Sequence, residues 1–545
     1  MKKQIAFALA LAIGVSALAG CAKTETTKSG GGSDLSNLNT TGFPIVKEKI
    51  NMTMMGINIP NVVDWNENKF FERMEEKTNI HFDCTPIPNQ SAAEKISLAF
   101  ASDDLPDVWF KMNFTQEDEV KYDAEGQLIP LQNLIDQYAP TIKAVIDGEY
   151  DLGGGEYTLP NGEKMYAPPG YGNIREAITL RNGNIVTLPQ VRHQLNQEQF
   201  WLNKNWLQKL NLSEPKTTQD FYEIMKAFKE GDPNGNGQAD EIPFSSCAEW
   251  SINTLKRFMS AWGIYFNDYD LFEDEGKVVY APLTPEFKEA MIYFNKMYKE
   301  GLIDQEFFIQ SVEQYMAKAA GDNNKLGAVN GYSAPVPPSR YKEYTAMTPI
   351  STSADVEGLH PATTGITPGT FAITKNNKYP EATIRWVDYL YTEEGSTLSG
   401  YGVENEDFAY NEDGSWDYLN YDPSDPTKTT GKVTIQLGVP GPGIFLTEFN
   451  AKVNNPDDQL LAVEVSKVNK HIRLPFPPLY YEESDSKRMK SLNVDLSGYV
   501  EQMMAKFIVG EMDIEENWAT FESTLKGMGA DELVSIAQKT YDFSK

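Results

Sequence analysis

The chain has few cysteines and few histidines. Its 545 residues include three cysteines and four histidines, and no two histidines lie close together in the sequence. Besides Cys21, which follows an apolar N-terminal run, only Cys84 and Cys247 are present, far apart in the sequence. This count excludes a disulfide scaffold, and the histidine spacing argues against a histidine-based zinc site. We expect Cys84 and Cys247 to be two separate buried thiols, although the sequence alone does not decide their pairing.

Basic residues and long apolar runs are also scarce. There are 48 lysines and arginines against 78 acidic residues, giving a net charge of -30. Nucleic-acid binding calls for basic patches, so this balance argues against that class of partner. Beyond the N-terminus no apolar run reaches the roughly 18 residues of a membrane span. A chain of this length is too long to fold around a single hydrophobic core, so we expect two or more large lobes.

The N-terminus has the three regions of a secretory signal peptide. Lys2 and Lys3 precede an apolar run at 5–15, and Leu18-Ala19-Gly20-Cys21 closes the segment. This order resembles a bacterial lipoprotein signal, which implies cleavage after residue 20, a lipid on Cys21 and a location outside the cytoplasmic membrane. The Gly-, Ser- and Thr-rich residues 21–42 predict a flexible linker, because they bury too little apolar surface to fold.

Strand-like and helix-like segments then alternate. Residues 50–57, 81–85 and 106–110 have strand character, and residues 66–77 and 92–101 have helical periodicity. This βαβαβ rhythm favours an α/β fold with a parallel sheet. Later helices are expected at 217–229, with Thr217 as a candidate cap, and at 285–300, 380–391 and from 496 onward.

The order of short motifs along the chain resembles the sugar-binding class of ABC-importer solute-binding proteins, the extracellular solute-binding protein family 1. The runs that carry the resemblance, in chain order, are Ala101-Ser102-Asp103-Asp104-Leu105-Pro106-Asp107-Val108, Gly126-Gln127-Leu128-Ile129-Pro130-Leu131, Tyr138-Ala139-Pro140, Trp201-Leu202-Asn203-Lys204-Asn205-Trp206-Leu207, Pro215-Lys216-Thr217-Thr218, Lys299-Glu300-Gly301-Leu302-Ile303-Asp304, Phe371-Ala372-Ile373-Thr374-Lys375, Tyr379-Pro380-Glu381-Ala382, Asp388-Tyr389-Leu390 and Lys506-Phe507-Ile508-Val509-Gly510-Glu511. Each run is weak alone, and the order and coverage make the match specific. Within the family the chain looks most like the large lipoprotein-type proteins that bind oligosaccharides, including the alginate-binding type.

The resemblance implies a two-lobed periplasmic-binding-protein fold with a ligand cleft between the lobes. By analogy the chain crosses between lobes near 188–190, near 365–369 and around 439–449. Lobe one would then be 43–190 plus 365–450, and lobe two 191–364 plus 451–545. The implied function is capture of an oligosaccharide by hinge closure and its delivery to membrane permease subunits, without enzymatic activity.

One loop has the spacing of a calcium site. Between residues 232 and 241, side-chain oxygens stand at positions 1, 3, 5 and 9 of an EF-hand-type loop, with a glycine at position 6 and a backbone carbonyl available at position 7. The candidate ligands are Asp232, Asn234, Asn236, Gln238 and Asp240. Position 12 is Pro243, which cannot ligate through its side chain; the resemblance to the alginate-binding type implies that Glu241, the tenth residue, supplies the acid instead. The expected role is structural, and an Asn/Gly-rich surface turn is the alternative.

Sugars need aromatic platforms and polar partners, which we sought near the ends of strands. The candidates are Asp64, Trp65, Trp109, Lys111, Gln190, Arg192, His193, Trp250 and Tyr332. Tyr332 matches by position a cleft aromatic of the maltose-type proteins that the chain resembles. Arg192 with Lys111 or Arg181 could hold a uronate carboxylate, whereas a neutral oligosaccharide would use the same platforms. For each tryptophan, burial in the core is the alternative.

Two other function classes stay open at this point. The same fold could bind a peptide or another non-sugar solute, or hand its ligand to a membrane kinase. An extracellular glycan-cleaving enzyme would need two carboxylates at a cleft, and 78 acidic residues do not exclude this. The chain carries no G-x-S-x-G, H-E-x-x-H or P-loop motif, so those nucleophile, zinc and ATPase mechanisms lack support.

Overall fold

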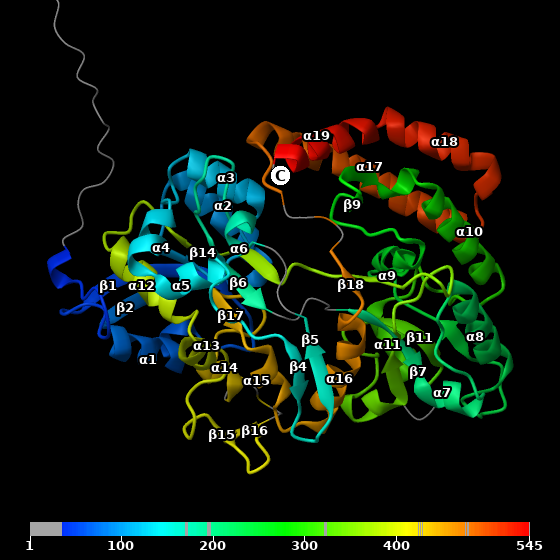
Figure 1. Cartoon of the computed structure of the whole chain (residues 1–545), viewed down its shortest axis with the longest axis horizontal. Coiled ribbons are helices and arrows are strands. Elements are labelled where there is room, and N and C mark those ends of the chain that lie inside the picture. The colour runs from blue at the N-terminus through cyan, green and yellow to red at the C-terminus, as the bar shows by residue number, and fades with distance from the viewer. Residues whose placement is uncertain are drawn as a thin grey trace, which may run out of the picture.

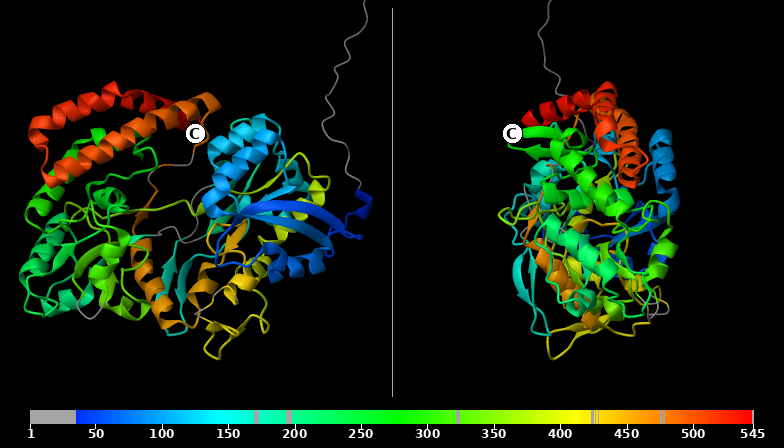
Figure 2. Two further views of the ribbon diagram at one scale, coloured as in Figure 1. Left: turned by 180° about the vertical axis from the view of Figure 1, so that it is seen from behind. Right: turned by 90° about the vertical axis from the view of Figure 1, so that its right-hand side faces the viewer.

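The computed structural model describes residues 35–168, 173–192, 198–320, 324–422, 425, 427, 429–474, 476 and 479–543. These residues form two α/β bodies that lie side by side, and the view from behind shows the same two bodies (Figures 1 and 2). We call them the first core and the second core. The signal peptide, Cys21 and His193 of the sequence analysis lie outside the described residues.

The first core is built on a six-stranded sheet of order β17-β6-β14-β3-β1-β2. The strands are β1 (Ile50–Asn58), β2 (Ile80–Pro88), β3 (Val108–Phe110), β6 (Leu188–Arg192), β14 (Ile366–Ile373) and β17 (Gly443–Phe445). β1 pairs in parallel with β2 and with β3, which confirms the predicted parallel arrangement of these three strands. β14 runs antiparallel to both β3 and β6, so the sheet is mixed.

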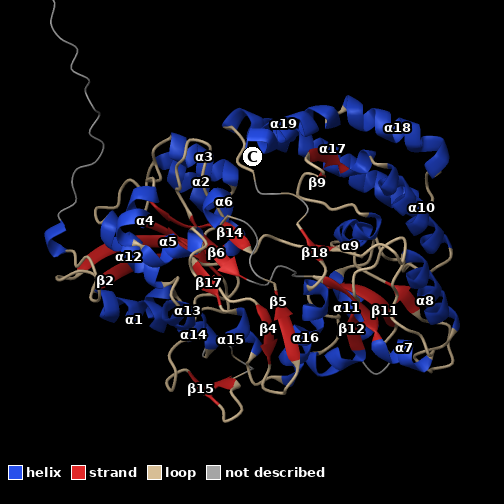
Figure 3. Ribbon diagram, in the orientation of Figure 1, coloured by secondary structure: helices blue, strands red, loops and turns tan. Residues whose placement is uncertain are grey.

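Helices cover both faces of this sheet (Figure 3). They are α1 (Lys69–Thr78), α2 (Ala92–Ser102), α3 (Gln116–Ala124), α4 (Gln132–Tyr138), α5 (Pro140–Ile146), α6 (Ile174–Ala177), α12 (Pro380–Tyr389), α13 (Glu393–Gly400), α14 (Thr430–Val433) and α15 (Thr447–Ala451). α1 begins three residues later than the sequence predicts. Asn68 caps it by accepting a hydrogen bond from the Phe70 amide at 2.9 Å, and the preceding residues form a short 3-10 turn instead.

The segment 35–46 corrects the predicted extent of the linker. It packs on the first core, where Ile45 and Val46 are buried and Leu38 bridges to Val46. Arg385 of α12 donates to the carbonyl oxygens of Asn39 and Gly42. Residues 35–42 are therefore part of the folded body, because Leu38 and these carbonyl contacts supply the anchoring that composition alone does not reveal.

The second core is built on a four-stranded sheet of order β12-β7-β11-β8. The strands are β7 (Gln199–Asn203), β8 (Ile242–Phe244), β11 (Leu326–Gly331) and β12 (Tyr344–Ala346). The helices around it are α7 (Lys204–Lys209), α8 (Thr218–Glu230), α9 (Ser251–Phe258), α10 (Pro285–Lys299), α11 (Val312–Ala319), α16 (Pro456–Asn469), α17 (Glu483–Val509), α18 (Ile514–Gly527) and α19 (Ala530–Phe543). β8 and β11 are parallel neighbours, so their carboxyl ends point to the same edge of the sheet.

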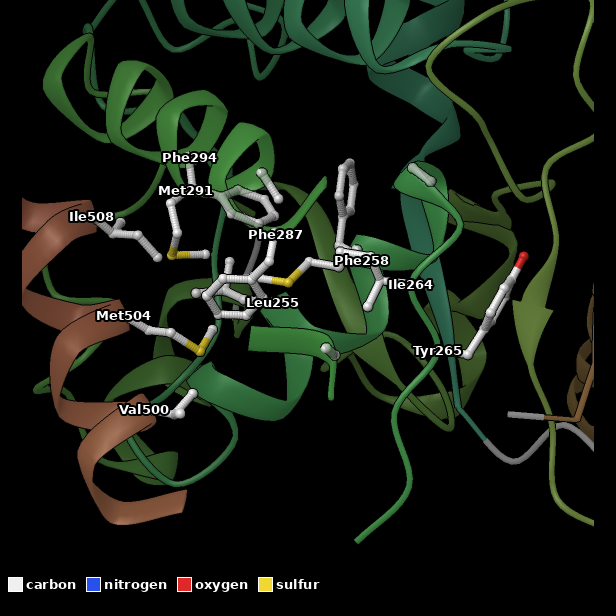
Figure 4. Packing of buried hydrophobic residues seen from close by; sticks show 14 of the residues in the cluster. Leu255, Phe258, Ile264, Tyr265, Phe287, Met291, Phe294, Val500, Met504 and Ile508 are labelled. Atoms are coloured by element: carbon white, nitrogen blue, oxygen red, sulfur yellow. The ribbon is translucent and has the colours of Figure 1, made fainter. Parts of the chain in front are cut away.

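Aromatic and methionine side chains of the second core join three helices that are distant in the sequence. Phe287, Met291 and Phe294 of α10 meet Val500 and Met504 of α17, with α9 beside them (Figure 4). The predicted helix at 285–300 is confirmed, with Pro285 in its first turn and Thr284 as its cap. Thr217 likewise caps α8, accepting from the Asp220 amide at 3.1 Å. These contacts attach the C-terminal helices to the second core.

In the described part of the chain, four two-stranded pairs complete the fold: β4 (Gly155–Thr158) with β5 (Lys164–Ala167), β9 (Leu271–Asp274) with β10 (Lys277–Tyr280), β13 (His360–Pro361) with β18 (Ile472–Arg473), and β15 (Phe408–Tyr410) with β16 (Trp416–Tyr418). Cys84 and Cys247 are free, buried thiols in different cores, as predicted. Among the described residues no helix combines the length and the apolar character that crossing a membrane requires.

Candidate functional site

Several chain segments meet between the two cores. The ring of His360 in β13 lies 2.7 Å from the carbonyl oxygen of Glu198, which precedes β7. The backbone of His360 donates to the carbonyl of His471 at 2.7 Å, and the Ala362 amide donates to Arg473 at 2.9 Å. Glu198 is therefore tied to the segment that leads from β13 to β14, and that segment is tied to β18. We call the connections from β6 to β7 and from β13 to β14 the crossover segments; of the first, the structure describes only Glu198.

A pocket lies where these segments leave the first core. Its volume is about 700 Å³, and we call it the crossover pocket. Residues of α5, the loop after it, the start of α6, β6 and β14 line it: Val145 to Gly153, Asn173, Ile174, Arg175, Val191, Arg192, Thr364 and Ile366. Its size lies within the range of small-molecule sites, which is roughly 300–1,000 Å³.

A fixed charge pair lines the pocket. The Nε of Arg175 lies 2.5 Å from Oδ1 of Asp147, and Lys143 lies 2.5 Å from the other oxygen of that carboxylate. The hydrogen bonds from Arg175 and Lys143 lower the pKa of Asp147 to about 2. A second carboxylate, Asp136, lies 3.5 Å from the Arg175 guanidinium. Asp147 is therefore ionised at neutral pH, and its geometry is set before any ligand arrives.

Two exposed aromatic residues lie on the second core at the carboxyl ends of parallel strands. Tyr332 directly follows β11 and is 60% exposed, and Trp250 follows β8 and is 37% exposed. The Tyr332 carbonyl accepts from the Gln199 amide group at 3.0 Å, which fixes the backbone at this point. Trp250 stands edge-on to the buried Tyr315, with ring centroids 6.2 Å apart. Both predicted platforms are thus accessible on the same edge of the sheet.

Two arginines from different cores lie near Tyr332. Burial lowers the pKa of the Arg192 and Arg257 guanidiniums, whereas the electrostatic effect of the Tyr332 phenol acts to raise both pKa values. Arg257 of α9 lies 2.7 Å from the Glu198 carboxylate, and Arg192 donates to the Gln190 side chain at 2.9 Å. Among the described residues, the Nε groups of both arginines are buried without a hydrogen-bond partner. Arg192 also lines the crossover pocket, so it connects the pocket with the aromatic edge of the second core.

Burial corrects the role expected for two tryptophans. Trp65 and Trp109 have no exposed surface. The Trp65 ring stacks on Phe71 at 5.6 Å, and the Trp109 ring stacks on Phe100 at 5.4 Å. β3 is buried on both faces, so its side chains fill the hydrophobic core. Neither residue offers a platform to a ligand in this conformation.

The polar candidates of the first core also bind the protein itself. Asp64 caps the short turn that begins at Trp65, accepting from the Asn66 amide at 2.9 Å. Lys111 is fully buried and donates to the carbonyls of Ile435 and Leu437, and burial lowers its pKa to about 7. Gln190 is buried and donates to Gln436 at 3.0 Å. The structure thus places Arg192 in the lining of the crossover pocket and leaves Tyr332 and Trp250 exposed on the second core, and it assigns Asp64, Lys111 and Gln190 to internal contacts.

Sequence reasoning missed four polar residues of this region: Asp147, Arg175, Glu198 and Arg257. Arg175 lies in the short helix α6, which Asn173 caps, after a Gly-rich stretch that gives little structural signal. Arg257 lies in the last turn of the short helix α9. No local pattern distinguishes either residue, because their partners come from other segments of the chain.

The loop 232–241 has its oxygen-bearing side chains turned inward. Asp232 accepts from the amides of Gly235 and Gly237 at 3.0 and 3.2 Å, and Asp240 accepts from the side-chain amides of Asn234 and Asn236, each at 2.9 Å. Lys325 lies 2.9 Å from the Asp240 carboxylate. Burial acts to raise the pKa of Asp240, but the hydrogen bonds from Lys325, Asn234 and Asn236 outweigh it and lower that pKa to about 2. Three of the expected calcium ligands, Asn234, Asn236 and Asp240, therefore contact one another, and Asp232 binds the backbone of the same loop.

Glu241 provides a test of whether this loop fits a cation. Both of its carboxylate oxygens are buried and have no hydrogen-bond partner among the described residues. Burying an unpaired carboxylate is costly, so such a group normally faces a cation or a donor. No cluster of three His, Cys, Asp or Glu side chains occurs in the described part of the chain, so a cation here would also need amide and carbonyl oxygens. Hard divalent cations such as calcium accept these ligands.

Two α/β cores joined by crossover segments, with a pocket beside those segments, define the class of two-lobed solute-binding proteins. Residues 64–397 match the family described as bacterial extracellular solute-binding protein, and the chain belongs to this family.

The chain is similar over nearly its whole length to a characterised relative. It is 28% identical, over 98% of this chain and 97% of the relative, to the fructooligosaccharide ABC transporter substrate-binding protein FusA of Streptococcus pneumoniae. The solved structure of FusA with kestose aligns at a TM-score of 0.68 and 26% identity, covering 90% of this chain and 99% of that one. A structure of a FusA EF-hand mutant with fructo-nystose aligns at a TM-score of 0.67 and 25% identity, with the same coverage.

Proposed function

We propose that this protein is the substrate-binding component of an ABC importer and captures an oligosaccharide between its two cores. The observation that carries the proposal is the crossover pocket with Arg192 in its lining, together with the exposed Tyr332 of the second core, whose phenol acts electrostatically on Arg192. The exposed tyrosine ring suits the C–H face of a sugar, and the charged groups of the pocket suit its hydroxyls. The full-length similarity to a fructooligosaccharide-binding protein supports the same ligand class.

We infer that the ligand is a neutral oligosaccharide of the fructan kind. The lysine and arginine that we expected to join Arg192 around a uronate are engaged elsewhere. Lys111 is taken by two backbone carbonyls, and Arg181 lies 3.3 Å from Glu482 and over the Phe543 ring. A uronate-containing ligand stays the alternative, with Arg257 in place of those two groups.

Closure of the two cores around the ligand is part of this proposal. We assign lobe one to 43–190 plus 365–450, with the packed segment 35–42 added to it, and lobe two to 191–364 plus 451–545, with the crossover segments as the hinge. Binding of the ligand to both lobes would favour the closed form, because a ligand shifts the equilibrium toward the state it binds better. The closed form would then be the one that the permease subunits receive.

A lipid on Cys21 would hold the protein at the outer side of the cytoplasmic membrane, and a calcium ion in loop 232–241 would stabilise the second core. The buried, unpartnered Glu241 carboxylate supports the calcium site, as does the EF-hand of the relative. Asp232, Asn234, Asn236, Asp240, Glu241 and the carbonyl of Gln238 would hold the ion. Its positive charge would offset the carboxylates that converge there.

A thermal-shift screen with product analysis tests the proposed function. The chain without residues 1–21 is mixed with neutral fructans, uronate oligosaccharides and peptides, and the bound material is recovered and analysed. A ligand that binds only the folded state raises Tm, and more so as its concentration exceeds Kd. A rise with kestose, recovered intact, is the expected result. A rise only with peptides would move the assignment to another solute, and cleaved glycan would move it to an enzyme.

A further inference from the structure

The lining of the crossover pocket combines apolar and charged side chains. Val145, Ile146 and Val191 form part of this lining, but they are buried and expose almost no surface to a ligand. Asp147 and Arg175 are joined by the 2.5 Å contact between Oδ1 and Nε, and their side chains are 20% and 29% exposed. The pocket therefore offers a ligand a fixed donor and a fixed acceptor.

The Arg175 guanidinium is fixed on two sides. Asp147 takes its Nε, and Asp136 lies 3.5 Å from its NH2 group. Lys143 binds the second oxygen of Asp147 and lies 4.0 Å from Asp136, so the four groups form one network. A planar guanidinium held in this way loses little further freedom when it donates to a ligand, which favours binding of paired oxygen atoms.

The geometry points to a subsite for the terminal unit of the oligosaccharide in the crossover pocket. We propose that Arg175 and Asp147 form hydrogen bonds with the hydroxyl groups of that unit. Arg192 would contact the following unit, and the ligand would extend from there to Tyr332. This inference rests on the proposed function. It adds that the crossover pocket is the part of the binding site that selects the ligand. The volume of about 700 Å³ accommodates one end of a chain, and the second-core aromatics would contact the rest.

Isothermal titration calorimetry with sucrose, kestose and nystose tests this subsite. Arg175→Gln removes the charged donor and leaves Asp147 paired with Lys143, so the local fold should persist. We expect affinity to fall roughly 10- to 100-fold for all three sugars, because a hydrogen bond to a charged group is lost from a unit common to all. Trp250→Ala should instead weaken the longer sugars more than sucrose.

Lys164→Gln is the matched control. Lys164 forms a comparable 2.5 Å contact with Glu156 on the β4–β5 pair, and neither residue lines the pocket. Its affinities should equal those of the wild-type protein. An unchanged affinity for Arg175→Gln, at an unchanged Tm, would overturn the terminal-unit subsite while leaving the proposed function intact.

A measurement on the wild-type protein guards against misfolding of the variant. Phenylglyoxal labels accessible arginines, and mass spectrometry quantifies each site. Kestose should protect Arg175 from labelling and leave Arg488, an exposed arginine paired with Glu532, unchanged. Binding of kestose without protection of Arg175 would overturn the subsite. If the wild-type protein binds another glycan from the screen, that glycan replaces kestose here, and if it binds none, both proposals fall.

Discussion

The Nε2 of His360 lies 2.7 Å from the carbonyl oxygen of Glu198, so the two crossover segments are bonded to each other at the edge of the second core. His360 is buried, and burial together with the nearby Arg257 lowers its pKa to about 3. The ring is therefore neutral at physiological pH. With a carbonyl oxygen as its partner, its Nε2 carries the hydrogen and donates.

This histidine should make the protein sensitive to acid. Because the pKa is about 3 in the folded state and about 6.5 in an unfolded chain, the stabilisation is present above pH 6.5 and is lost as pH falls toward 3. His360→Gln keeps an N–H donor and removes the titration, so its unfolding free energy should fall less on acidification. Urea unfolding at pH 4, 5 and 7 measures this. The same loss in His360→Gln as in the wild-type protein would assign the acid sensitivity to other groups.

Glu119 should give the opposite pH dependence. This buried carboxylate accepts from Thr187 and Tyr480, each at 2.6 Å, and burial raises its pKa to about 7. The stability it contributes is complete below about pH 4.5 and is lost as pH rises through 7. Glu119→Gln should therefore have a higher Tm than the wild-type protein at pH 8 and little advantage at pH 5. The exposed Glu125→Gln is the control, and a constant difference between pH 5 and 8 would contradict the argument.

Removing calcium should destabilise the protein through Glu241. If calcium is bound at 100-fold above its Kd, the ion adds about 2.7 kcal/mol to the unfolding free energy, and a chelator removes this amount. Glu241→Gln should be less stable than the wild-type protein with calcium. With chelator it should be as stable or more stable, because it buries no unpaired charge. Tm values measured with calcium and with chelator show whether the order of stability of the two proteins reverses. The exposed Glu249→Gln should have the wild-type Tm in both conditions.

Substitution of Tyr332 should change sugar affinity, whereas substitution of Trp109 should change the stability of the fold. Tyr332 is mostly exposed, so Tyr332→Ala should lower sugar affinity about tenfold and leave Tm nearly unchanged. Trp109 is fully buried, so Trp109→Ala should cost about 3 to 5 kcal/mol of stability by opening a cavity. Calorimetry of binding and of unfolding on both variants checks this. A Trp109→Ala protein with native Tm and lost affinity would restore that residue to the ligand site.

Much of the fold follows from periodicity, and most of the site does not. The Pro285 helix and the first three strands follow from local patterns that tertiary packing leaves intact. β3 shows the limit of such patterns. Trp109 and Phe110 point to opposite faces, yet both faces are buried, so alternation cannot distinguish core from cleft. The role of Lys111 depends on carbonyl groups more than 300 residues later in the chain.

The site residues differ in how much local signal they carry. The oxygen spacing in loop 232–241 is a local property, and the structure brings Asn234 and Asn236 into contact with Asp240 within this loop. Tyr332 and Arg192 lie at the ends of strands, where the expectation of accessible groups is general. Arg175 and Arg257 become recognisable only through Asp147 and Glu198, which approach them from other elements.

The N-terminal segment packs on the first core alone, so the two cores would differ in how freely they move relative to the membrane. Lys77 lies over the rings of Phe43 and Tyr389, 4.8 and 4.7 Å from their centroids, and Arg385 binds the segment just before Phe43. If Cys21 carries a lipid as proposed, the chain between it and Leu35 spans at most about 50 Å even when fully extended. The first core would then be the attached lobe, held close to the bilayer. The second core would move relative to it, so opening and closing would take place beside the membrane.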